Sequence, residues 1–84
     1  MCMWLVICAL PNHLFGDLNA ALKQFAGEKY QVLQNQDSEP KTSTVFIRFS
    51  HYSDGECVQR WAHNNTLVTR SASSFSAIRG YGGE

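Results

Sequence analysis

A run of seven consecutive apolar residues constrains this chain more than any other feature. Residues 3–9 read MWLVICA, and a leucine and a proline follow. Seven residues is the length of a strand and too short for a membrane span, and an apolar run without alternation indicates burial on both faces. We therefore expect residues 3–9 to form an interior strand of a sheet.

Two later segments have the patterns of helices. In the first, apolar residues recur at helical intervals, at Leu14, Leu18, Ala21, Leu22 and Phe25. Asp17 suits the beginning of this helix and Gly27 suits its end. In the second, residues 53–56 (SDGE) have the form of a capping box that opens a helix, and Asn64 and Asn65 are expected to end it.

Further strands are expected after the first helix and around the second. Residues 44–49 (TVFIRF) alternate most clearly, so that one face should hold Val45, Ile47 and Phe49. The opposite face should then hold Thr44, Phe46 and Arg48. Residues 30–35 (YQVLQN) are expected to form a short strand, and residues 67–70 and 75–78 are weaker strand candidates. The polar residues 36–43 between two of these strands are expected to form a loop.

The order of the expected elements is β-α-β-β-α-β. With right-handed crossovers, this order predicts an α+β fold, the ferredoxin-like βαββαβ sandwich, in which a four-stranded antiparallel sheet has two helices on one face. We also expect strands 3–9 and 44–49 to be parallel neighbours, which would bring His13 and His51 to the same end of the sheet. Residues 1–79 are expected to form one domain and residues 80–84 a flexible tail.

Charge and cysteine content narrow the classes of function. Seven Lys and Arg balance seven Asp and Glu, so any contact with nucleic acid must come from a local patch. Cys2, Cys8 and Cys57 are odd in number and widely spaced, which favours neither disulfides nor a zinc site. We expect an intracellular protein that has no metal, no cofactor and no membrane segment.

Several short motifs in this layout resemble those of the RNA-recognition motif (RRM) over about residues 4–78. Residues 5–11 (LVICALP) match the spacing of the hexamer in the family's first strand, and residues 46–49 (FIRF) match the end of its third-strand octamer. Further positions resemble the family at Asp17, Leu18, Phe25, Gly27, Asn64, Asn65 and Arg70. The resemblance implies a ferredoxin-like fold that binds single-stranded RNA on the sheet face without helices.

RRMs stack bases on three aromatic side chains of that open face, and this chain keeps one of them. Val6 and Thr44 occupy two of the aromatic positions, and Phe46 occupies the third. Trp4 and Arg48 are expected beside Phe46, where they could help to hold one or two bases. Tyr30 is expected to extend the same face. The candidate residues for binding RNA or a partner are therefore Trp4, Val6, Tyr30, Thr44, Phe46 and Arg48.

The apolar character of this face leaves the kind of ligand open. Because two aromatic positions are replaced, protein is favoured over RNA as the main occupant, in the form of the C-terminal tail, a second subunit or a partner in an RNA-processing assembly. A small dimeric ferredoxin-fold protein similar to Cas2-like or toxin–antitoxin proteins is an alternative, in which the chain would form a homodimer. An adaptor or inhibitor without a nucleic-acid role is another. We expect no enzyme, although His13 and His51 could serve as acid and base in a metal-independent ribonuclease.

Overall fold

The computed structural model describes residues 1–37 and 41–81, so residues 38–40 of the expected loop and 82–84 of the expected tail lie outside it. The elements follow in the order β1 (Met3–Pro11), η1 (Asn12–Leu14), α1 (Phe15–Ala26), β2 (Tyr30–Gln36), β3 (Thr42–Phe49), α2 (Tyr52–Asn64), β4 (Val68–Ala72), α3 (Phe75–Ile78) and η2 (Arg79–Tyr81). The strands form one antiparallel sheet in the order β2-β3-β1-β4. This arrangement confirms the ferredoxin-like α+β fold.

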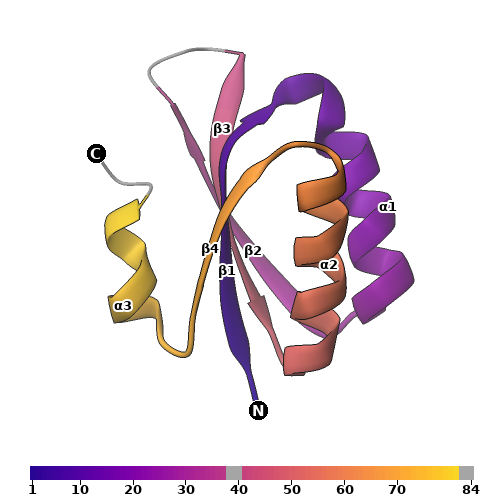
Figure 1. Cartoon of the computed structure of the whole chain (residues 1–84), viewed down its shortest axis with the longest axis vertical. Helices are drawn as coiled ribbons and strands as arrows, with labels where there is room; N and C mark the ends of the chain where they lie inside the picture. Colours follow the sequence, from indigo (N-terminus) through magenta and orange to yellow (C-terminus); the bar gives the residue numbers. More distant parts are fainter. Residues whose placement is uncertain (38–40, 82–84) are drawn as a thin grey trace.

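The main core lies between the sheet and the two long helices, which cover one of its faces (Figure 1). As the alternation predicted, Val45, Ile47 and Phe49 point from β3 into this core. The other fully buried members are Met3, Leu5, Ile7, Leu10, Leu18, Leu22, Val58 and Ala62. β1 is an interior strand, as its continuous apolar sequence indicated.

β1 and β3 are antiparallel neighbours, and the expectation that they run parallel was wrong. The first residue of β1 pairs with the last residue of β3. Each helical crossover joins two parallel strands and skips the strand between them, which therefore runs the other way. His13 follows the end of β1 and His51 follows the end of β3, so the two imidazoles lie at opposite ends of the sheet. The expected acid–base pair is not assembled.

A β-bulge extends β1 beyond the residues expected for it. Ile7 pairs with Val45 and Leu10 pairs with Ser43, so two residues of β1 face one residue of β3. Ala9, the second of these two, has a positive φ of 53°. Because of the extra residue, Leu10 points into the main core on the same side as Ile7.

α2 begins before the expected capping box and ends where it was expected to end. His51 is the N-cap and its side chain makes no capping hydrogen bond. Ser53 and Glu56 therefore lie inside the helix and form no capping box, because the extended residue that precedes the helix is His51. The helix ends at Asn64, as expected. Gly27, with a φ of 62°, ends α1 as expected.

Residues 75–78 form the short helix α3, and the expectation of a strand there was wrong. The Ser74 hydroxyl accepts a hydrogen bond from the Ala77 backbone N–H at 3.3 Å, which caps the helix. α3 lies on the face of the sheet opposite α1 and α2 (Figure 1). A helix on this face was not expected, and it covers part of the candidate binding surface.

Candidate functional site

The register of the strands places most of the candidate residues on the face that α3 occupies. Trp4 pairs with Arg48, and Val6 pairs with Phe46. Val6 and Phe46 point away from the main core and belong to a second cluster of buried residues. The sequence therefore predicted correctly that Phe46 turns away from α1 and α2.

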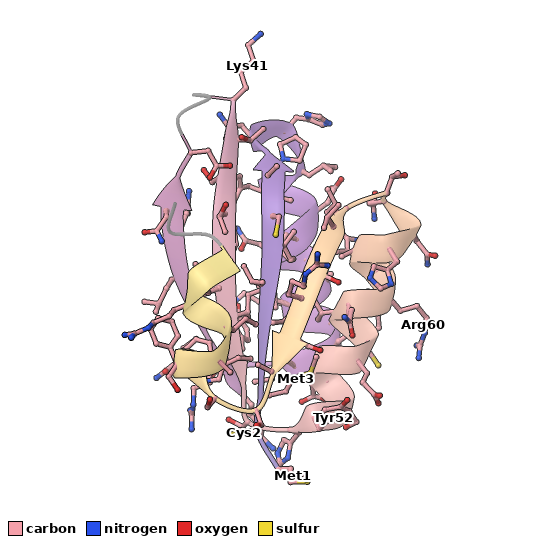
Figure 2. The ribbon with its side chains drawn as sticks, turned by 60° about the vertical axis from the view of Figure 1, so that its left-hand side comes forward. Met1, Cys2, Met3, Lys41, Tyr52 and Arg60 are labelled. Carbon is pink, nitrogen blue, oxygen red and sulfur yellow. The ribbon has the colours of Figure 1, made fainter. Side chains whose placement is uncertain are left out.

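α3 covers this face, which was expected to be open. Val6, Phe46 and Ile78 of α3 form the small second core, and Trp4 packs at its border. Phe46 is only 3% exposed. The ring of Phe75 lies 4.8 Å from Trp4 and 5.9 Å from Phe46, measured between ring centroids. Figure 2 shows α3 lying over the strands of the sheet. The apolar face is thus occupied by a later segment of the same chain.

Tyr30 does not belong to this surface. It pairs with Phe49 and packs against the main core, on the side of α1 and α2. Leu33, three residues further along β2, pairs with Phe46 instead and lies on the α3 side, where it is 52% exposed. Thr44 is buried, and its hydroxyl donates to the carboxylate of Asp37 at 2.8 Å. Of the six candidates, Arg48 is exposed on the α3 side of the sheet.

A groove with a volume of about 530 Å³ borders the covered face between β2 and α3. It brings together two phenyl rings, the side-chain amide of Asn35, one leucine and one guanidinium, whereas the Gln34 side chain projects from the other face of the sheet because Gln34 pairs with Val45. Its lining residues are Leu33, Gln34, Asn35, Phe46, Phe75, Arg79 and Gly80. Phe75 is 38% exposed, so part of its ring is accessible. Phe46 was expected to be functional from the sequence, whereas Phe75 was assigned to a weak strand.

Positive charge is concentrated around this face although the whole chain is neutral. Arg48 and Arg70 project from β3 and β4 on the α3 side, because they pair with Trp4 and Val6. Arg79 lines the groove. Asp37 also lies beside this face, and its carboxylate accepts from the hydroxyls of two threonines at 2.9 and 2.8 Å.

The two long helices have the opposite balance of charge. Their charged residues are Asp17, Lys23, Asp54, Glu56 and Arg60. Three of these five are acidic, whereas three arginines surround the α3 side. Although the net charge of the chain is zero, the α3 side therefore carries a local positive patch to which an anionic ligand could bind.

Cysteine chemistry contributes little to the site. Burial raises the pKa of the Cys8 thiol, nearby Arg70 lowers it in part, and Asp37 raises it further. The thiol is therefore protonated at neutral pH and is a poor nucleophile. Within residues 1–37 and 41–81, no group of three or more His, Cys, Asp or Glu side chains could hold a metal ion. No helix of the same residues is long and apolar enough to cross a membrane.

Comparison with known proteins adds no further constraint on function. No model of a protein family matches the chain. No curated protein matches it either. The resemblance to the RRM therefore rests on the short motifs and on the order of the strands and helices.

Proposed function

We propose that this chain is an RRM-like binding module that holds single-stranded RNA weakly at the groove between β2 and α3. The composition of the groove is the observation that supports this most. An accessible part of the Phe75 ring offers a surface on which a base can stack, and Asn35 offers an amide for a base edge. Arg79 offers a guanidinium for a phosphate.

The size and charge of the site agree with a short stretch of single-stranded nucleic acid. A volume of about 530 Å³ is in the range of sites that hold a small organic ligand, so it suits one nucleotide. Arg48 and Arg70 lie on the same side of the sheet, where neighbouring phosphates could reach them. Three arginines neutralise few phosphates, and we therefore expect weak binding that falls as salt concentration rises.

Among the protein occupants that the sequence favoured for this face, a separate partner has less support than the C-terminal part of the chain itself. That preference depended on an exposed apolar face formed by Trp4, Val6 and Phe46. Because Ile78 and Phe75 fill this face, the chain itself supplies the apolar cover. What stays accessible is the polar and aromatic groove, which suits a base and a phosphate better than a large apolar partner.

The proposal is tested by fluorescence anisotropy with a pool of short labelled RNAs of mixed sequence. Arg79→Ala should weaken binding about five- to tenfold, since it removes a charge-assisted contact to phosphate. It should also lower the dependence of log affinity on log salt by about 0.7. Arg60→Ala is the matched control, because Arg60 lies on α2 and points away from the sheet (Figure 2).

Two results would overturn the proposal. One is the absence of binding to every RNA in the pool, and the other is an equal loss of affinity in Arg79→Ala and Arg60→Ala. An NMR titration of labelled protein locates the contact independently. Shifts should cluster at Leu33, Asn35 and Phe75, whereas shifts confined to α1 and α2 would contradict the assigned site.

A further inference from the structure

β2 is an edge strand that pairs with β3 on one side and, among the described residues, with no strand on the other. An edge strand presents backbone N–H and C=O groups that can pair with another strand. Natural proteins usually protect such edges with charges, prolines, bulges or a covering segment.

Among the residues that the structure describes, β2 lacks the usual protections along its length. Its sequence, YQVLQNQ, contains no charge and no proline. Its pairing with β3 runs through seven consecutive residues without a bulge. Val32 and Leu33 at its centre are 40% and 52% exposed, one on each face. The other edge strand, β4, has Arg70 at its middle residue. β2 is thus the edge suited to pairing with a further strand.

We propose that a second copy of this chain pairs with β2, strand against antiparallel strand, about a twofold axis at Leu33. Such pairing joins two sheets of four strands into one continuous sheet. In this register, a residue that lies a given number of positions before Leu33 in one copy pairs with the residue that lies the same number of positions after Leu33 in the other copy. Leu33 then meets its own counterpart, and Gln31 faces Asn35 with both amides on the α3 side.

Charge complementarity selects this register. Lys29 and Asp37 lie four residues before and four residues after Leu33. A twofold axis at Leu33 therefore sets the ammonium of one copy opposite the carboxylate of the other, twice in each dimer. Moving the axis by one residue in either direction removes both pairs. Since the chain has no net charge, no overall repulsion opposes the association of two copies.

The backbone at both charged positions is already held in line with the sheet. The Lys29 carbonyl accepts from the Ser50 N–H at 3.2 Å, which continues the β2–β3 ladder by one residue. At the other end, the Asp37 N–H donates to the Thr42 carbonyl at 3.3 Å. The Asp37 carboxylate is also held by two threonine hydroxyls. Residues 29–37 therefore form an extended, preordered edge with opposite charges at its two ends.

Sedimentation equilibrium of the RNA-free chain over a range of concentrations tests the proposal. We expect a weak dimer, because pairing through one strand buries a small interface. Lys29→Glu should raise the dissociation constant about tenfold, since two attractive pairs become repulsive. The double variant Lys29→Glu/Asp37→Lys should recover most of this loss, because it exchanges the charges. High salt should reduce all of these differences.

A second pair of variants keeps the test decisive if Asp37→Lys disturbs the fold. Leu33→Lys sets two ammonium groups against each other at the axis and should give a monomer. Val68→Lys is the matched control, since Val68 is 57% exposed on the opposite edge strand. A wild-type chain that stays monomeric at all concentrations would overturn the proposal, and so would equal dissociation by the two lysine variants. Because no RNA is present, neither result bears on RNA binding at the groove.

Discussion

The ring of Phe75 lies 4.8 Å from the indole of Trp4, centroid to centroid, with the two planes tilted by 52°. Trp4 belongs to the interior strand β1 and Phe75 to α3, so this contact holds a late segment across the sheet. We expect Phe75→Ala to lower the free energy of unfolding by about 1–2 kcal/mol, less than for a fully buried ring. Urea denaturation measures this change.

The same variant should also expose Trp4 to water. In a Trp61→Phe background, Trp4 is the only tryptophan, and its emission should shift to longer wavelength when Phe75 is replaced. The main core does not contain Phe75, so the far-UV circular dichroism should keep its native form. An unchanged emission spectrum together with unchanged stability would show that α3 does not cover Trp4 in solution.

A close approach between α2 and β1 requires glycine at position 55. A Cβ there would collide with the Met3 sulfur and would lie 3.1 Å from Cδ2 of Phe49. Both of these side chains are fully buried, so they have little room to move. We expect Gly55→Ala to destabilise the fold by about 1–3 kcal/mol in thermal or urea unfolding.

Gly16→Ala is the control for this substitution. Gly16 also lies in a helix, but a Cβ there meets nothing within 4 Å. Alanine at this position should leave stability unchanged or raise it by up to about 1 kcal/mol, through its better helix propensity. Equal losses from Gly16→Ala and Gly55→Ala would contradict a specific collision at α2.

Thr66 stores backbone strain at the end of α2. Its φ is 62°, in the left-handed region that a β-branched residue rarely adopts. The Leu67 N–H donates to the Ala62 carbonyl at 2.9 Å and the Thr66 N–H donates to the His63 carbonyl at 3.0 Å, which together form a Schellman motif. Thr66→Gly should therefore stabilise the protein by about 1 kcal/mol in chemical denaturation. Thr66→Ala retains a Cβ, and a gain as large as that of glycine would argue against strain as the cause.

The thiol of Cys8 makes stability depend on pH in the alkaline range. Burial raises its pKa in the folded chain, so the unfolded chain loses this proton at a lower pH. Above the ordinary thiol pKa, near 9, the unfolded state therefore binds fewer protons than the folded state, and the free energy of unfolding falls as pH rises. Below that pH the thiol is protonated in both states and has no such effect.

Unfolding of the wild type and of Cys8→Ala, measured from pH 7 to pH 10.5, isolates this contribution. We expect the wild type to lose more stability than the variant above about pH 9, since the variant has no thiol at this position. All other ionisable groups are common to both proteins, so their effects cancel in the comparison. Parallel curves over the whole range would contradict a raised pKa.

The strands and long helices could be predicted because their side-chain periodicity reflects burial directly. Alternation in β3 gave the correct face for Phe46 and Ile47, and the apolar spacing in α1 gave a helix that ends before Gly27. The relative direction of β1 and β3 was wrong for a different reason. A helical crossover joins parallel strands, whereas the direct connection from β2 to β3 reverses the chain, so β1 and β3 run in opposite directions.

The candidate site was predicted less well, because α3, the helix that covers it, is too short to show a helical periodicity of apolar residues. Residues 75–78 make one helical turn, and four residues that include Phe75 and Ile78 fit a strand equally well. Tyr30 was placed on the wrong face although Val32, which shares its face, is also apolar. Two apolar residues on one face of an edge strand indicate the main core, and that signal was present in the sequence.

The position of β1 between β3 and β4 has a consequence for synthesis on the ribosome. β1 is synthesised before both of its neighbours, and the second of them, β4, ends at Ala72. Until β4 has left the exit tunnel, an apolar strand that is central in the native fold has at least one flank uncovered. Folding must therefore wait for contacts between distant parts of the chain, which slows it and exposes the nascent strand to chaperones.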